Sequence, residues 1–593
     1  MCGICGELRF DHQQPDPRQL DAMLETLARR GPDNEGRFFT GPVALGHRRL
    51  SIIDLSERAN QPFVDKEIGL SLVFNGTIYN YPALRKTLQS KGHRFVSSGD
   101  SEVILRAYHE WGADCVLHLH GMFAFAIWDN NQQQMFLARD RLGIKPLYFS
   151  EDNRHFRFAS NPQALLAAGD INTDIDPIAL HHQFTLHAVV PAPRTVLQGI
   201  RKLAPGTTLT ISSDGKQHHH CYWRLNATRP EKQLSECEWI DQIHDALRQS
   251  VEKRKVIADV PVGVLLSGGL DSSLLVALLA EAGVKDLRTF SVGFEDSEEE
   301  CGSEFHYSDQ VVEMYGTQHQ KFLVPNSDVL KRLPEAVMNM AEPMVGQDAV
   351  AFYLLSEQVS KHVKVVQSGQ GADEVFGGYF WYSLMQNESG SDLDRFRKHY
   401  FDRDHDEFLE MVQSPFHGPD YTASLVESLL AQPDADTFLD KVLRMDVTTL
   451  IVDDPVKRVD NMTMAWGLEA RVPFLDHELV ELAAQMPPEL KLKNGGKHPL
   501  KLISRGILPD SVIDRPKGYF PLPALKYVRG EFLTFMKEIL LSDECRQRGL
   551  FQSTYVEEIL KQPEKHLTRI KGNKLWHMAL LEYWLQLNVD KKH

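Results

Sequence analysis

The sequence predicts two unlike domains, an α+β domain followed by an α/β domain. Up to about residue 200, strand-like runs at 71–74 and 122–128 lead into polar turns, which is typical of antiparallel strands with a few helices. Beyond about residue 240, apolar strands alternate with helical segments, the pattern of a parallel sheet with crossover helices. From about Asp436 the pattern is mainly helical.

Spacing and turn residues predict the elements of the first domain. Apolar residues between Leu20 and Leu27 recur at helical spacing, and Gly31-Pro32 ends that helix. The strand at 71–74 runs into Asn75-Gly76, which favours a turn, and the strand at 122–128 runs into the polar turn 129–134.

A stretch rich in Pro, Gly, Ser and Thr, from about Pro191 to Gln233, separates the two patterns. We therefore expect a first domain over 1–205, a linker over 206–240 and a second domain over 241–593. In the second domain, strands are predicted at 260–266, 288–293 and 362–367, with helices at 272–282 and 349–360.

Composition narrows the class of protein. The chain has 593 residues and a net charge of −16, with the acidic excess spread along it, which argues against nucleic acid or an anionic membrane as partner. Seven scattered cysteines do not form a disulfide framework, and no apolar run approaches the roughly 18 residues of a membrane span. We expect a cytoplasmic enzyme.

The position of Cys2 is unusual. If Met1 is removed, Cys2 carries a nucleophilic thiol and a free α-amine that can act as its base. Cys2-Gly3-Ile4-Cys5 also fits a Cys-x-x-Cys redox or zinc motif, but neither a βαβ context nor a second ligand pair lies nearby. The tetrapeptide alone favours a buried terminal strand.

Other residues of the first domain favour a catalytic role for Cys2 over a purely structural one. Arg49 places a guanidinium at the start of an apolar strand, where it could grip a carboxylate. Asn75 and Gly76 offer an amide side chain and an unhindered N–H, the donors of an oxyanion hole. Asp100 could hold an ammonium group. Singly, each has a structural explanation; together they suit a thiol enzyme that grips an amino acid.

Five motifs carry a family resemblance, and they are Cys2-Gly3-Ile4, Arg30-Gly31-Pro32-Asp33, the segments 49–54 and 75–80, and the segment 140–148. Through them, residues 1–160 resemble the class II glutamine amidotransferase domain, an N-terminal-nucleophile hydrolase with an αββα sandwich. The resemblance implies that Cys2 attacks the glutamine side-chain amide and releases ammonia. It further implies an oxyanion hole at Asn75 and Gly76, and glutamine binding by Arg49, Asn75, Gly76, Thr77 and Asp100.

A second site is predicted at Ser267-Gly268-Gly269-Leu270-Asp271-Ser272, where a buried strand, two glycines and a helix start form an anion cradle. It is not a Walker loop, since the chain has no Gly-Lys-Ser/Thr, and a chance strand–helix turn stays open. Asp271 and Asp373 each follow a strand and would suit a Mg²⁺ that bridges phosphates.

This loop resembles that of N-type ATP pyrophosphatases. With the segments 368–378 and 460–476 it resembles the synthetase domain of asparagine synthetase B, an α/β ATP-pyrophosphatase-like domain with a helical C-terminal part. The resemblance implies an acyl-adenylate intermediate, ATP as substrate, Mg²⁺ and a homodimer. The implied ATP-binding residues are Leu266, Ser267, Gly268, Gly269, Asp271, Ser272, Val292, Ser368 and Gly369. The resemblance also implies that Asp271 and Asp373 bind Mg²⁺ and that Lys501 neutralises the phosphates, with Lys497 as the alternative.

One position departs from the family pattern. Asparagine synthetases read Ser-Gly-Glu-Gly-Ala-Asp-Glu where this chain has Gln370 in third place, beside the implied acyl-adenylate. A subgroup with this glutamine and similar length amidates N-acetylglutaminylglutamine, so we expect that acceptor, with aspartate as the alternative. A non-catalytic relative would have lost reactive residues, and Cys2, Asn75 and Asp271 are all present.

Overall fold

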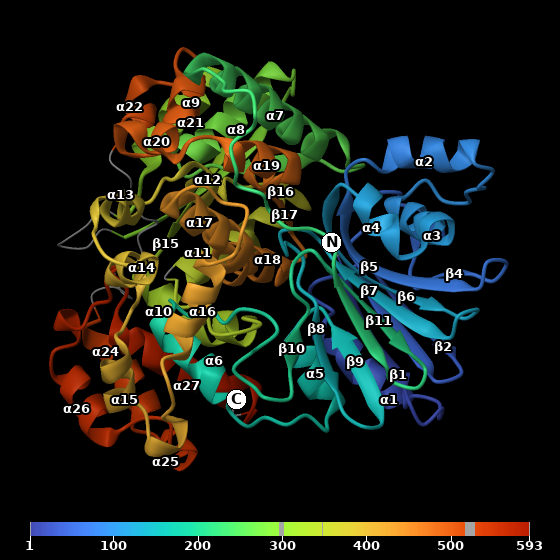
Figure 1. Ribbon diagram of the computed structural model, residues 1–593, viewed down its shortest axis with the longest axis horizontal. Coiled ribbons are helices and arrows are strands. Elements are labelled where there is room, and N and C mark those ends of the chain that lie inside the picture. The colour runs from blue at the N-terminus through green and yellow to red at the C-terminus, as the bar shows by residue number, and fades with distance from the viewer. Residues whose placement is uncertain (1, 296–301, 347, 516–527, 592–593) are drawn as a thin grey trace.

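The computed structural model describes residues 2–295, 302–346, 348–515 and 528–591, and it divides into two domains of the predicted classes (Figure 1). The N-terminal domain holds two antiparallel sheets, and the C-terminal domain holds one parallel sheet among many helices. The predicted fold class is therefore confirmed for both domains.

The first sheet of the N-terminal domain has the order β10-β8-β9-β1-β3-β2. Its strands are β1 (Gly3–Arg9), β2 (Asn34–Thr40), β3 (Val43–Arg49), β8 (Tyr148–Glu151), β9 (His155–Ala159) and β10 (Arg201–Lys202). β1 lies inside the sheet, between β3 and β9, and Cys2 directly precedes it.

The second sheet has the order β12-β11-β7-β6-β5-β4. Its strands are β4 (Phe63–Asp65), β5 (Leu70–Ile78), β6 (Gly121–Asp129), β7 (Gln134–Arg139), β11 (Thr207–Ser212) and β12 (Gln217–Cys221). The β11–β12 hairpin lies in the predicted linker, yet it pairs with β7 and so extends the sheet of the first domain.

The two sheets stack face to face through an apolar layer that includes Ile4, Leu45, Val73 and Trp128. Helices α1 (Pro17–Thr26) and α5 (Pro162–Ala168) cover the outer face of the first sheet. Helices α2 (Tyr81–Ser90) and α3 (Asp100–Trp111) cover the second, and the short helices α4 (Cys115–His118) and α6 (Pro177–Thr185) complete the domain. The four layers form the expected αββα sandwich.

The C-terminal domain is built on a five-stranded parallel sheet of order β15-β14-β13-β16-β17. Its strands are β13 (Val262–Leu265), β14 (Arg288–Phe294), β15 (Gln318–Val324), β16 (Val365–Gln367) and β17 (Glu469–Arg471). The helices between these strands are α8 (Leu270–Glu281), α9 (Phe305–Tyr315), α10 (Asn326–Met338) and α11 (Asp348–Val359), preceded by α7 (Glu236–Val256). Strands and helices alternate as the sequence predicted.

The helical part begins earlier than predicted, directly after β16. It contains α12 (Ala372–Phe376), α13 (Phe380–Asn387), α14 (Asp392–Tyr400), α15 (His405–Met411), α16 (Tyr421–Leu430), α17 (Phe438–Met445), the π-helical turns η4 (Asp446–Leu450) and η5 (Val452–Val456), α18 (Lys457–Met464), α19 (His477–Gln485), α20 (Pro488–Leu492), α21 (His498–Ser504), α22 (Asp510–Ile513), α24 (Gly530–Leu540), α25 (Asp543–Arg548), α26 (Ser553–Lys561) and α27 (Lys574–Asn588). β17 interrupts this part, and three residues are too short a strand to leave a periodic pattern.

Two local predictions in the first domain were wrong. Asn75-Gly76 does not end a strand, because β5 continues to Ile78 and pairs with β6 throughout. Gly76 is required there, since a Cβ would lie 2.1 Å from the Met122 carbonyl oxygen. Arg49 ends β3 rather than starting a strand, since the buried residues from Val43 to Gly46 pair with β1 instead.

Among the described residues, no helix is both long enough and apolar enough to cross a membrane.

Candidate active sites in two domains

A cavity of about 780 Å³ opens where the strands of the parallel sheet end. Carboxyl ends of parallel strands are where ligands bind in open α/β sheets. Nine of the residues predicted to bind ATP or Mg²⁺, or to lie beside the acyl-adenylate, line this cavity. They are Leu266, Ser267, Asp271, Ser272, Val292, Ser368, Gly369, Gln370 and Asp373.

Gly268 and Gly269 shape the loop from behind the cavity surface. Gly268 has a φ of +75°, and a Cβ there would lie 2.7 Å from the backbone nitrogen of Ser308. The Ser272 hydroxyl accepts a hydrogen bond from the Ser267 backbone N–H at 3.1 Å, which folds the loop onto the start of α8. Among the described residues, no side chain caps the start of α8, and Asp271 and Ser272 of its first turn line the cavity, so the positive end of the helix dipole lies beside it.

A lysine joins the two predicted metal-binding carboxylates. Lys497 Nζ lies 2.6 Å from Asp271 Oδ2 and 2.8 Å from Asp373 Oδ2. Burial alone lowers the pKa of Lys497, but the two carboxylates outweigh it and raise that pKa above its usual value. Lys501, four residues on, donates instead to the Asn494 carbonyl and is not brought together with these groups. The two carboxylates thus already converge on one cation.

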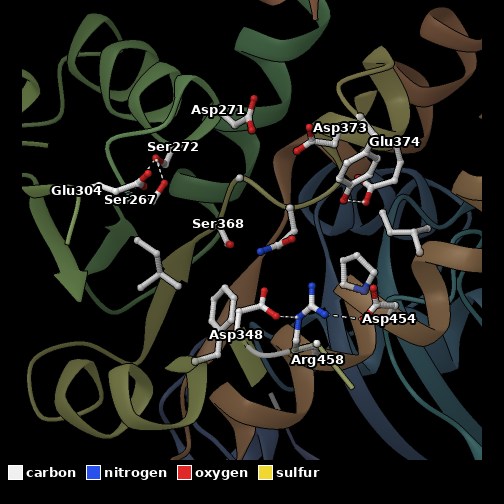
Figure 2. A pocket seen from close by; sticks show the side chains of 18 of the residues that line it. Ser267, Asp271, Ser272, Glu304, Asp348, Ser368, Asp373, Glu374, Asp454 and Arg458 are labelled. Carbon is white, nitrogen blue, oxygen red and sulfur yellow. Dashed lines mark hydrogen bonds and ion pairs between the residues drawn. The ribbon is translucent and has the colours of Figure 1, made fainter. Parts of the chain in front are cut away.

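The far part of the cavity includes residues outside the predicted motifs, namely Asp348, Asp454 and Arg458. Figure 2 shows Arg458 between Asp348 and Asp454, with Glu374 and Asp373 on the opposite wall. Arg458 Nε lies 3.1 Å from Asp348 Oδ1, and Arg458 also pairs with Asp454. Its guanidinium is therefore shared between two carboxylates.

Aromatic side chains complete that far part. Tyr379, Trp381 and Tyr400 line it, and Tyr379 donates a 2.8 Å hydrogen bond to Glu374. Tyr379 and Trp381 stack with ring centroids 4.1 Å apart. A single acidic residue in a helix is usually part of a surface ion pair, and a single aromatic residue is usually part of a core. Only the fold, which brings these residues together, indicates that they form a binding site.

The thiol of Cys2 is the centre of the second site, in the N-terminal domain. Cys2 is 8% exposed, and its backbone nitrogen donates a 3.0 Å hydrogen bond to Asn75 Oδ1. Asn75 is wholly buried, and its Nδ2 has no hydrogen-bond partner among the described residues. A buried amide donor left unpaired costs free energy unless a ligand satisfies it, which is what an oxyanion would do. Burial raises the pKa of the Cys2 thiol, so its activation depends on a nearby base.

Arg49 and Asp100 frame this site. The Arg49 guanidinium donates to the Ser56 carbonyl at 2.9 Å and to Asn60 Oδ1 at 2.7 Å, which fixes its orientation. Asp100 begins α3 and accepts a 3.0 Å hydrogen bond from the Ile78 backbone N–H. Burial raises the pKa of Asp100 to about 6. Its charge therefore changes near neutral pH.

Buried contacts tie the Cys2 site to the other domain. Thr77 donates to Glu469 on β17 at 3.3 Å. Arg30 donates to the Cys2 carbonyl at 3.3 Å and pairs with Asp460 at 3.0 Å, and Lys145 reaches the same Asp460 at 3.0 Å. Sequence reasoning missed Glu469 and Asp460 as neighbours of the Cys2 site, since they belong to the other domain and lie far along the chain.

Comparisons with known proteins match both halves of the chain. The model of the family described as "Asparagine synthase" matches residues 242–586, and that of "Glutamine amidotransferase domain" matches residues 1–223. Glutamine-hydrolyzing asparagine synthetase 1 of Bacillus subtilis (strain 168) is 32% identical, over 100% of this chain and 98% of its own. Glutamine-hydrolyzing asparagine synthetase 3 of the same organism is 33% identical, over 88% and 87%. A solved glutamine phosphoribosylpyrophosphate amidotransferase from B. subtilis, complexed with ADP and GMP, is 17% identical over 49% of this chain and 75% of its own, with a TM-score of 0.29.

Proposed function

The chain belongs to the asparagine synthase family, and from that premise we propose that it amidates the carboxylate of N-acetylglutaminylglutamine. Its general reaction follows from the family: a carbon–nitrogen ligase that hydrolyses glutamine, uses ATP and forms AMP and pyrophosphate. The identity of the acceptor, the roles of the site residues and the binding of Mg²⁺ are what we propose.

In the first half-reaction, the Cys2 sulfur attacks the side-chain amide carbon of glutamine. The α-amine that Met1 removal would free on Cys2 takes the thiol proton, and Asn75 Oδ1 would hold this amine. Asn75 Nδ2 and the Gly76 N–H donate to the oxyanion. Ammonia then leaves, and water hydrolyses the thioester to glutamate. The buried Asn75 Nδ2, which has no hydrogen-bond partner in the described parts of the chain, is the observation that supports this assignment.

Glutamine binding is expected to weaken at acid pH through Asp100. Its pKa of about 6 means that the carboxylate that would attract the α-ammonium is lost as pH falls below 6. The KM for glutamine should then rise about tenfold per pH unit. Steady-state glutaminase kinetics between pH 5 and 8 measure this. Asp100→Asn should have a high KM with no such slope, and an unchanged slope in that variant would contradict the assignment.

In the second half-reaction, ATP would lie with its phosphates on the 267–272 loop and its adenosine near Leu266, Val292, Ser368 and Gly369. The acceptor carboxylate attacks the α-phosphorus and pyrophosphate leaves; ammonia then attacks the acyl carbon and AMP leaves. Asp271 and Asp373 would hold Mg²⁺, because their oxygens already meet at one cation, and the ion would neutralise the phosphates. Lys497 is better placed than Lys501 to add positive charge there.

The acceptor assignment is carried by Gln370, which lines the cavity where the family resemblance expects a glutamate. A neutral amide suits an acceptor with no ammonium group to attract. Beyond Gln370, the cavity continues to Tyr379, Trp381 and Tyr400, so it has room for an acceptor longer than a four-carbon acid. Arg458 is already shared by Asp348 and Asp454 and offers no dedicated clamp for an α-carboxylate.

Offering each acceptor in turn tests this assignment. With ATP, Mg²⁺ and glutamine, we expect N-acetylglutaminylglutamine to be amidated at least about 100-fold more efficiently than aspartate, since a site built for one set of polar groups rejects others by that order or more. Mass spectrometry of the products and pyrophosphate release measure this. Gln370→Glu should lower kcat/KM for the dipeptide. Asparagine formation at a comparable rate by the unmodified protein would overturn the assignment.

Aspartate is the second candidate, and a specific observation favours it. Acidic side chains, Asp348, Glu374 and Asp454, line the far part of the cavity and would attract an α-ammonium. The two Bacillus relatives are named asparagine synthetases.

A further inference from the structure

A histidine of the N-terminal domain reaches into the cavity of the C-terminal domain. His187 follows α6 and lines the far part of the cavity. Its backbone has a φ of +54°, which is uncommon for a residue with a side chain. The segment is anchored to the second domain, because the Asp402 N–H donates to the Thr185 carbonyl at 2.9 Å. The cavity wall is thus completed by the other domain.

One side of the His187 ring is held by a buried carboxylate. His187 Nδ1 lies 3.1 Å from Asp402 Oδ2, and the Asp402 side chain is wholly buried. The hydrogen bond assigns the proton on Nδ1, since a carboxylate only accepts. His577 stands behind the pair, with its Nδ1 3.4 Å from the same Asp402 oxygen. Nε2 is the ring nitrogen left for a ligand in the cavity.

The charges around His187 favour a donating Nε2. Burial alone lowers the pKa of His187, but the Asp402 carboxylate outweighs it and raises that pKa above its usual value. Asp454 raises it further and Arg458 lowers it. Burial lowers the pKa of His577 to about 3, so His577 stays neutral and does not compete for the proton. His187 therefore holds a second proton at higher pH than a free histidine.

The side chains that line the cavity around His187 indicate what its Nε2–H can bind. Arg458 is occupied by Asp348 and Asp454, and the neighbouring ring of Tyr379 donates to Glu374. Asp446, Trp381 and Tyr400 also line the cavity, together with Lys571 and the aliphatic side chains of Leu450, Ile451 and Ile570. A hydrogen-bond donor in such surroundings matches a neutral carbonyl oxygen better than a second cation.

We propose that His187 Nε2 donates a hydrogen bond to an amide or acyl carbonyl oxygen of the acceptor, at the end remote from the reacting carboxylate. Asp402 is the positioning residue that orients the ring. This inference rests on the proposed function and deepens it, because an N-acylated dipeptide carries such carbonyls and aspartate does not. It also makes acceptor recognition depend on both domains.

Kinetics of His187→Ala in the full-length protein test the proposal. We expect the KM for N-acetylglutaminylglutamine to rise about tenfold or more, with the KM for ATP and the glutaminase rate within about twofold. His306→Ala is the matched control, since His306 lines the same cavity next to Tyr307, close to the phosphate loop. It should leave the acceptor KM unchanged. An unchanged acceptor KM in His187→Ala would overturn the proposal.

A shortened acceptor separates the inference from the proposed function. Glutaminylglutamine lacks the acetyl carbonyl, so the unmodified protein should bind it more weakly, while His187→Ala should discriminate less between the two dipeptides. Equal discrimination by both proteins would exclude a contact to that carbonyl; an unchanged acceptor KM in the variant would exclude any contact. If the unmodified protein amidates neither dipeptide, the proposed function fails instead.

Asp402→Asn tests the positioning role by a pH profile. In the unmodified protein, the acceptor KM should rise as pH increases through the raised pKa of His187, because the second ring proton is lost. Without the Asp402 charge, that rise should begin at lower pH. A profile that keeps its position in a folded Asp402→Asn protein, with glutaminase activity intact, would contradict the role of Asp402.

Discussion

Replacing Cys2 with alanine is expected to abolish glutamine-dependent amidation and to spare amidation driven by added ammonia. The variant loses the thiol next to Asn75, and removal of a catalytic nucleophile typically costs a factor of about 1,000 or more. Of the residues that the structure describes, none at the Cys2 site lines the cavity of the second domain, so ammonia supplied from solution should still be used. Product formation with glutamine and with ammonium chloride, at equal ATP and acceptor, measures both.

Cys5→Ala is the matched control for this variant. The Cys5 thiol is wholly buried among Leu20, Leu24 and Gly46, inside the core between the first sheet and α1. Its loss should cost stability of about 1 kcal/mol at most, and both activities should remain. If Cys2→Ala lost both activities while folded, the separation of the two sites would be wrong.

The N-terminal site was the more predictable of the two. Its residues lie in short motifs near strand ends, and chemistry alone indicated a nucleophile, an oxyanion hole and a charged clamp. The structure brings Asn75 to Cys2 as expected, but Asn75 and Gly76 lie within β5 rather than in a turn. The turn propensity of Asn-Gly yields here to pairing with β6, since nine residues of β5 are held in register by that strand.

The far part of the cavity could not be predicted from the sequence. Asp348, Arg458 and His187 come from three distant segments, and none lies in a motif. Each alone has an ordinary explanation, an ion pair at a helix end or a histidine packed on a loop. Their convergence depends on how the helices after β16 fold back over the sheet and on how the two domains dock, which no local pattern encodes.

The sequence also could not decide between Lys497 and Lys501, because both lie near the start of α21 and differ by one helical turn. Only the three-dimensional contacts separate them: Lys497 bridges Asp271 and Asp373, and Lys501 turns back to Asn494. Spacing alone does not separate the two lysines, since Gly495 and Gly496 before α21 both have positive φ and give the loop several possible paths.

Lys497→Met is expected to lower ATP-dependent amidation by about 100-fold or more, the cost of removing one preorganised charge from a phosphate site. Two half-buried carboxylates would also be left facing each other without their shared cation, so the variant should lose thermal stability that Mg²⁺ partly restores. Lys501→Met, the same substitution one turn away, should change the rate by less than about threefold, because its ammonium is partly exposed and bonds a carbonyl outside the cavity.

Pyrophosphate release with saturating ammonia isolates this half-reaction from Cys2. Glutaminase activity without ATP should be equal in both variants, which shows that each is folded. A larger loss in Lys501→Met than in Lys497→Met would reverse the assignment and require Lys501 to move onto the phosphates when ATP binds.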